Sequence, residues 1–180
     1  FLQLNTFLKM EREIQLKGNK IHAPLIDAWL VAKPEEIVRQ KYIIRLIENY
    51  GFSIDQMAQE VQVNNSQRGQ GRAMADIVIW KSEKDKNNDN HAAIVVECKA
   101  EHLTIREEDY FQGYNYASWA GADFFVTTNL KETRIFKVVK GKIPKQLDEV
   151  IDIPKARIIN NDKKVKELLK QTKAFTRDEF

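Results

Sequence analysis

The chain has 180 residues, of which 43% are hydrophobic and 31% are charged, and its net charge is +3. This composition predicts a globular domain large enough to bury a core, and it excludes the disordered and fibrous classes of protein. The sequence has no bilayer-length apolar run, no signal-peptide pattern and only one cysteine, so we expect a cytoplasmic protein without a disulfide. One cysteine and three scattered histidines argue against a structural zinc site. The mildly basic charge is compatible with a nucleic-acid partner.

The first 32 residues carry mixed signals. Residues 1–18 have apolar side chains at roughly helical spacing, but a pair of strands fits them equally well. Residues 21–32 contain Pro24 and then a short β-like run, and we expect residues 1–32 to form a lead-in that packs on the core. Since the chain begins at Phe1 rather than Met, we also expect it to be part of a longer protein.

The most strongly predicted helix covers residues 33–50. Pro34 suits the first turn of a helix, and Gly51 ends it. The acidic residues Glu35 and Glu36 complement the positive end of the helix dipole. At 100° per residue, Glu36 shares a face with the largely apolar stripe of the helix, whereas Glu35 lies well off that face. We therefore assign Glu35 to helix capping and predict that Glu36 points inward, although capping alone would explain both.

Two neighbouring buried strands are predicted at residues 75–80 and 92–97. Both segments are rich in β-branched residues and are bounded by polar ones. The charged, Asn-rich residues 81–90 between them predict a solvated hairpin loop. A turn and a strand at residues 60–63 precede this pair.

The polar residues 64–71 predict a loop. Its two glycines do not open a helix, so a dinucleotide-binding fingerprint is rejected, and the sequence contains no phosphate-binding loop of the ATPase type. Arg68 and Arg72 lie just before the strand at residues 75–80. They either contact DNA phosphates or remain solvated loop charges.

The remainder of the chain predicts two helices and further strands. The acidic first turn and the terminal glycine of residues 106–120 predict a helix. The other predicted elements are strands at residues 123–128 and 134–139, a short edge element at residues 151–154, and a basic helix within residues 160–180 that suits a solvated terminal position. Together these elements predict an α/β (α+β) domain with a central mixed sheet flanked by helices.

Charged residues interrupt the apolar pattern of the two central strands. Asp76 begins the first strand, and Glu97 and Lys99 flank Cys98 at the end of the second. Because side chains alternate along a strand, Glu97 and Lys99 point to one face and Cys98 to the other. Charged groups on a hydrophobic strand are costly unless they are paired or used. The pattern predicts that Asp76 and Glu97 hold a hard divalent cation and that Lys99 orients a water beside it.

The arrangement of Asp76 and Glu97-Cys98-Lys99 resembles the core motif of the PD-(D/E)XK nucleases, with Ala75 in place of the namesake proline. Other segments resemble the N-terminal domain of the R subunit of type I restriction enzymes. These segments are PEEIVRQ at residues 34–40, the QxxxY pair formed by Gln112 and Tyr116, and VTTNLKETRIFK at residues 126–137.

The resemblance implies a restriction-endonuclease-like core and a DNA endonuclease that uses Mg²⁺, with Mn²⁺ as a substitute. It implies that Gln112 and Tyr116 steady the lysine or the DNA. The implied metal ligands are Asp76, Glu97, the backbone carbonyl of Cys98 and, through water, Glu36; the implied catalytic residues are Glu36, Asp76, Glu97, Lys99, Gln112 and Tyr116.

The resemblance also implies double-stranded DNA and the methylase and specificity subunits, or a fused methylase module, as partners, with room for a helicase domain in the full-length protein. We expect a nuclease-like domain at residues 33–154 and a linker at residues 155–180, since KAFTRDEF at residues 173–180 resembles the linker into a DNA methylase module. Two other functions remain open. One is a catalytically silent nuclease fold that binds DNA or subunits, and the other is a nuclease of DNA repair or of RNA.

Overall fold

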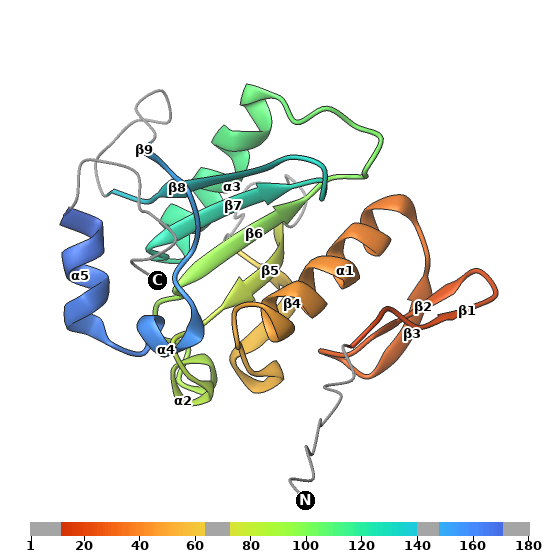
Figure 1. Cartoon of the computed structure of the whole chain (residues 1–180), viewed down its shortest axis with the longest axis horizontal. Helices are drawn as coiled ribbons and strands as arrows, with labels where there is room; N and C mark the ends of the chain where they lie inside the picture. The colour runs from red at the N-terminus through yellow and green to blue at the C-terminus, as the bar shows by residue number, and fades with distance from the viewer. Residues whose placement is uncertain (1–11, 64–72, 140–147, 171–180) are drawn as a thin grey trace, which may run out of the picture.

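A six-stranded mixed sheet forms the centre of the computed structural model, which describes residues 12–63, 73–139 and 148–170 (Figure 1). Its strands, in spatial order, are β4 (Met57–Gln62), β5 (Met74–Ile79), β6 (Ile94–Cys98), β7 (Phe124–Thr128), β8 (Thr133–Lys137) and β9 (Asp148–Val150). The pairing of β6 with β7 is parallel, and every other pairing in this sheet is antiparallel. A parallel pair needs a crossover connection, and the helix α3 supplies it here.

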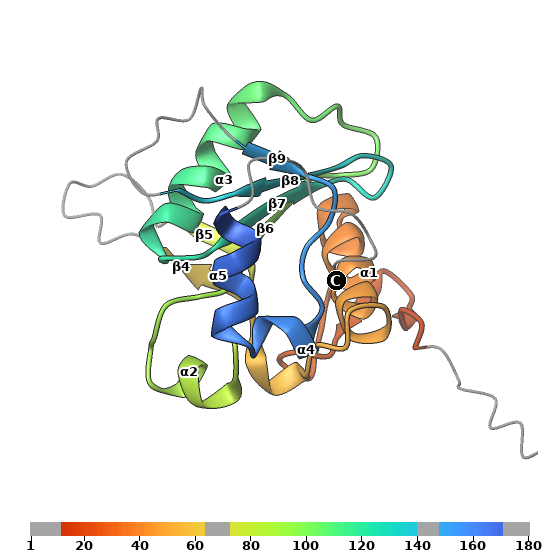
Figure 2. The same cartoon turned by 60° about the vertical axis from the view of Figure 1, so that its left-hand side comes forward.

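Helices cover both faces of the sheet (Figure 2). Residues such as Val96 and Phe124 form one buried cluster with α1, α4 and α5, and Val95 and Phe125 form another with α3. Strands buried on both faces are expected to be continuously apolar, as the central segments are. The helical elements are α1 (Pro34–Glu48), the 3-10 helix η1 (Ile54–Gln56), α2 (Glu83–Asn87), α3 (Glu107–Trp119), α4 (Ala156–Ile159) and α5 (Asp162–Lys170).

A second, smaller sheet lies on the side of α1 away from the six-stranded sheet (Figure 1). It consists of the antiparallel strands β1 (Leu16–Lys17), β2 (Lys20–Ala23) and β3 (Ala28–Val31). Its buried residues Ile21 and Ala23 face inward, and β2 contacts α1. Within the described ranges, no helix is long and apolar enough to cross a membrane.

The structure confirms the predicted fold class and the main elements. The helix predicted at residues 33–50 is α1, and the helix predicted at residues 106–120 is α3. The two central strands are adjacent and antiparallel, as predicted. The strands predicted at residues 123–128 and 134–139 are β7 and β8.

Three predictions for the segments that adjoin the central strands or follow them are wrong in part. The predicted loop at residues 81–90 contains α2, because the Ser82 side chain accepts a hydrogen bond from the Asp85 N–H and caps a helix. The strand predicted at residues 60–63 already begins at Met57. The edge element predicted at residues 151–154 is replaced by β9, since the Asp152 side chain binds Tyr50 and the following backbone amide instead of continuing the ladder.

The C-terminal helix also differs from the prediction. Val165 of α5 is only 2% exposed and belongs to the core cluster that contains α1, so α5 is not merely a solvated terminal helix. The short helix α4 has no counterpart in the sequence prediction. The predictions for residues 1–11 and 171–180, and for Arg68 and Arg72, lie outside the described residues.

The close packing of α3 on the sheet depends on Gly113. A Cβ atom at this position would lie 2.2 Å from the ring of Phe125 and 2.9 Å from Cγ of Glu97. We predict that Gly113→Ala lowers the free energy of unfolding by about 2 kcal/mol, because overpacking outweighs the gain of up to about 1 kcal/mol in helix propensity. Denaturant unfolding measures this, with the exposed Ser118→Ala on the same helix as the control; equal stability of both variants would contradict close packing at Gly113.

Candidate active site

The candidate site lies where β5 and β6 separate. Their hydrogen-bonded register ends at the pair Ile77 and Val96, and its continuation places Asp76 opposite Glu97 on the same face. The Cys98 N–H then donates to Oδ2 of Asp76 at 2.7 Å instead of to a backbone carbonyl of β5. Asp76 and Glu97 are both only 7% exposed. The Asp76 carboxylate therefore takes the place of a backbone acceptor at the end of β6.

Arg39 of α1 connects this carboxylate to the helix. Its Nη2 donates to Oδ1 of Asp76 at 2.6 Å, and its Nη1 donates to Oε2 of Glu36 at 2.7 Å. Glu60 lies 3.4 Å from the same Nη1. Burial lowers the pKa of Arg39, but the adjacent Asp76 outweighs it, so the pKa is raised and the cation is fixed.

The helix places Glu36 inward, as the helical spacing predicts. Its side chain is 12% exposed, and its Oε1 accepts a hydrogen bond of 2.7 Å from the fully buried Gln40. Glu35, which we assigned to capping, also faces this cluster. Burial and then the charge of Asp76 raise its pKa, and its Oε1 lies 4.0 Å from Arg39.

A strained residue of β4 lies beside the same cluster. Glu60 has a φ of +52°, which is unfavourable for a residue with a side chain. The ladder pairs Gln59 with Ile77 and Val61 with Ala75, and it omits the intervening pair of Glu60 and Asp76. Such strain costs on the order of 1–3 kcal/mol and is concentrated at functional sites.

Glu97 and Thr127 each have a buried oxygen atom that lacks a hydrogen-bond partner among the described residues. These residues are directly paired on β6 and β7 and therefore share a face. Oε1 of Glu97 and Oγ1 of Thr127 are buried and have no hydrogen-bond partner among the described residues. Burial, followed by the charge of Asp76, raises the pKa of Glu97. A buried carboxylate oxygen without a donor fits a cation.

The donor set suits Mg²⁺ only if the main chain and waters complete it. Within residues 12–63, 73–139 and 148–170, no group of three His, Cys, Asp or Glu side chains is arranged to hold a metal. Mg²⁺ is commonly bound through one or two carboxylates, with waters and substrate phosphates as the other ligands. Asp76 and Glu97 meet that requirement, and Glu36 is connected to Asp76 through Arg39.

Lys99 lies on the Glu97 face of β6 and is partly exposed. Its Nζ is 3.3 Å from Oδ1 of Asp109 on α3. Burial lowers the pKa of Lys99, but Asp109 more than compensates, so the pKa is raised and the side chain is an ammonium. Gln112 donates to the Tyr116 hydroxyl at 2.6 Å, and neither forms a hydrogen bond to Lys99 in the described part of the chain.

Sequence reasoning missed several members of this cluster. The sequence gives Arg39 significance only within the PEEIVRQ resemblance and Asp109 only within the acidic first turn of a helix, and it predicts no role for Glu60 or Thr127. No local signal marks them, because their partners are distant in sequence: Arg39 and Asp76 are 37 positions apart.

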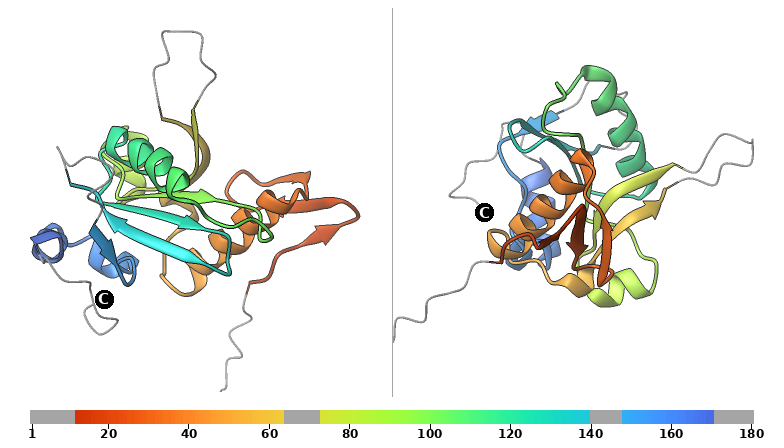
Figure 3. Two further views of the ribbon diagram at one scale, coloured as in Figure 1. Left: turned by 90° about the horizontal axis from the view of Figure 1, so that it is seen from above. Right: turned by 90° about the vertical axis from the view of Figure 1, so that its right-hand side faces the viewer.

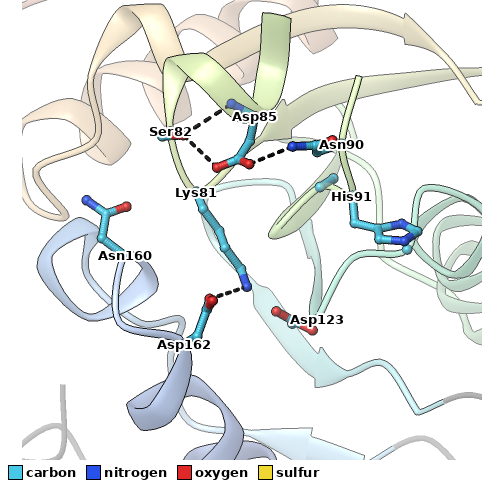
Figure 4. Close-up of a pocket in the computed structure, with 10 residues that line it drawn as sticks. Lys81, Ser82, Asp85, Asn90, His91, Asp123, Asn160 and Asp162 are labelled. Carbon is cyan, nitrogen blue, oxygen red and sulfur yellow. Dashed lines mark hydrogen bonds and ion pairs between the residues drawn. The ribbon is translucent and has the colours of Figure 1, made fainter. Parts of the chain in front are cut away.

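A separate polar pocket lies at the other end of β5 (Figure 4). It is open, with a volume of about 660 Å³, and Lys81 forms a 2.6 Å ion pair with Asp162 at its edge. Asp85 is hydrogen-bonded to both Ser82 and Asn90. Because these side chains satisfy one another, the pocket does not extend the candidate site.

One family of known proteins matches most of the chain. The model of the family described as type I restriction enzyme R protein N terminus (HSDR_N) matches residues 34–154. The chain belongs to this family. Its matched segment contains α1, the six strands and α3, and hence every residue of the candidate site named above. No curated protein and no solved structure matches the chain.

The raised pKa of Glu97 predicts a pH-dependent stability. The folded state retains this proton at pH values where the unfolded chain, with the ordinary value of 4.5, has lost it. Stability is therefore lost as the pH rises above about 4.5 towards the folded pKa. We predict that Glu97→Gln melts at a higher temperature than the wild type at pH 8, with little difference at pH 4. Thermal unfolding in EDTA measures this.

The exposed Glu83→Gln on α2 is the matched control, and it should leave the melting temperature unchanged at both pH values. A Glu97→Gln variant that is no more stable than the wild type at pH 8 would show that the carboxylate is not destabilised by burial.

Removal of the buried cation should be costly. We predict that Arg39→Met lowers the free energy of unfolding by about 3–5 kcal/mol, because it leaves buried carboxylates uncompensated. Arg45→Met on the same helix removes a cation that lies 5.8 Å from the Tyr42 ring, and it should cost less than about 1 kcal/mol. Urea unfolding near pH 7 compares the two variants. Similar losses would argue against a special role for Arg39.

Proposed function

We propose that this chain is the Mg²⁺-dependent DNA endonuclease domain of a type I-like restriction enzyme, with a site of the PD-(D/E)XK kind. The observation that carries the proposal is the juxtaposition of Asp76 and Glu97, in which Glu97 has a buried oxygen without a donor. Family membership supports a restriction function. It also supports double-stranded DNA and the methylase and specificity subunits as partners.

Mg²⁺ would be held by Asp76, Glu97 and the backbone carbonyl of Cys98, with Glu36 acting through water. When bound, the ion stabilises charge on the scissile phosphate and lowers the pKa of a water ligand. The chain itself provides orientation. Oδ2 of Asp76 is fixed by the Cys98 N–H, and its Oδ1 is fixed by Arg39, so the carboxylate is held in one position before any ligand arrives.

Lys99 acts as a cation in this proposal and not as the base that removes a proton. Its pKa is raised by Asp109, so it remains an ammonium near neutral pH. An ammonium on the Glu97 face orients a water or phosphate oxygen and stabilises negative charge that develops there. Gln112 and Tyr116 lie on the same helix as Asp109 and would contact the DNA backbone or steady this end of α3.

One observation favours a catalytically silent module as the second candidate. Both oxygens of Asp76 already have donors within the chain, so the site is electrostatically satisfied on that side without a metal. Calorimetric titration with Mn²⁺ separates the two functions. Binding that is lost in Asp76→Asn supports the nuclease, whereas DNA binding without any metal binding supports the silent module.

We predict that Asp76→Asn and Lys99→Met each reduce Mg²⁺-dependent cleavage of duplex DNA by at least about 100-fold, since each removes a preorganised charge at the reacting phosphate. Both variants should remain folded by circular dichroism. The exposed Lys84→Ala on α2 removes a lysine from the opposite end of β5 and should cleave like the wild type. Full cleavage by either site variant would refute the assignment.

A further inference from the structure

The small sheet presents a basic and aromatic face to solvent. Residues directly opposite one another in antiparallel strands share a face, as do alternate residues of one strand. By the observed register, one face carries Lys17, Lys20, His22, Trp29 and Val31, which we call the outer face. The opposite face carries the buried Ile21 and Ala23.

The two lysines of the outer face have no stabilising charge partner among the described residues. Lys17 lies directly opposite Lys20, an arrangement of like charges that destabilises a sheet. Both lysines are exposed, and neither has an ion pair with a described residue. Asp27, an acid in the turn between β2 and β3, is already paired with His22 at 3.0 Å. Two adjacent unpaired ammonium groups are complementary to an anionic partner.

Exposed apolar side chains share the outer face with these charges. Trp29 is 42% exposed and Val31 is 54% exposed, so a large ring and a branched side chain face solvent beside the lysines. The ring centroids of Trp29 and His22 are 5.3 Å apart. Unpaired lysines next to an exposed aromatic ring form the combination that binds phosphates and packs against sugars.

The position of the outer face relates it to the candidate site. Val31 ends β3 and pairs with Lys20, and α1 begins only three residues later at Pro34. By chain geometry, the Cα atoms of Val31 and Glu36 are no more than roughly 17 Å apart, which corresponds to about five nucleotides of one DNA strand. The right-hand view of Figure 3, in which the right-hand side of Figure 1 faces the viewer, shows the small sheet in front of α1.

We propose that the outer face binds the sugar-phosphate backbone of duplex DNA next to the cleavage site. The inference rests on the proposed function, because it takes DNA as the substrate. Lys17 and Lys20 contact phosphates, and Trp29 and Val31 pack against the adjoining sugars. Such contacts position the duplex without reading its sequence.

The test is a DNA-binding measurement that does not depend on cleavage. The full chain is titrated into a fluorescently labelled duplex in EDTA, and anisotropy gives the affinity over a series of salt concentrations. We predict that the double variant Lys17→Ala/Lys20→Ala binds at least about 10-fold more weakly at low salt. It should also reduce the slope of log K against log salt by about 1.8, since each phosphate contact contributes about 0.9.

The matched control is Lys163→Ala/Lys166→Ala, which removes the same charge from exposed positions of α5, on the far side of the molecule from the small sheet (Figure 1). It should bind DNA like the wild type. Trp29→Ala should weaken binding several-fold, whereas Trp119→Ala, which removes a similarly exposed ring at the end of α3, should not.

Three outcomes would overturn the proposal. The first is unchanged binding by Lys17→Ala/Lys20→Ala, and the second is an equal loss in the α5 control, which would indicate a general charge effect. The third is a wild-type chain that self-associates in sedimentation through Trp29 while Trp29→Ala binds DNA normally, which would make the outer face an interface between copies. Since Asp76→Asn retains the outer face, normal DNA binding by that variant keeps a failure of cleavage distinct from a failure of this inference.

Discussion

The candidate site depends on one buried guanidinium among several carboxylates. Arg39 binds Asp76 on the sheet and Glu36 on its own helix, and Glu60 of β4 lies within 3.4 Å. Without this cation, three acidic groups from different elements would repel one another, and two of them, Asp76 and Glu36, are largely buried. The same bonds add to the apolar packing that holds α1 against the sheet, so they link the position of the helix to the geometry of the acidic cluster.

The features that oppose stability at this end of the sheet lie within its strands. They include the left-handed backbone of Glu60 and the buried, unpartnered oxygens of Glu97 and Thr127. Three other described residues with side chains have a positive φ, and all three lie in turns or bends, namely Asp27, Asp89 and Leu130. Elsewhere the strands β5, β6 and β7 are almost entirely buried in regular ladders. Proteins commonly tolerate such local costs where a site must be preorganised for charge, and the surrounding core compensates for them. The distribution of strain therefore agrees with a functional site at Asp76 and Glu97.

Sequence patterns predicted most of the architecture, because apolar periodicity decides which segments become buried strands and helices. Helical spacing alone predicted that Glu36 points inward. The spacing of Ser82 and Asp85 is a capping signal for α2, although the surrounding charged and Asn-rich residues favour a loop. The pairing of Arg39 with Asp76, and of Lys99 with Asp109, could not be predicted, since it arises only when distant elements pack. That second pairing also raises the pKa of Lys99 and keeps its side chain an ammonium.

The termination of the β5–β6 ladder has a mechanical consequence. Cys98 is the last residue of β6, yet its backbone amide donates to the Asp76 side chain and not to a backbone carbonyl. The other oxygen of Asp76 accepts from Arg39. A ligand that draws the Asp76 carboxylate aside would deprive this buried amide of its acceptor and loosen the last residue of β6. Binding at the site and fraying of this strand end would thus be coupled through a single hydrogen bond.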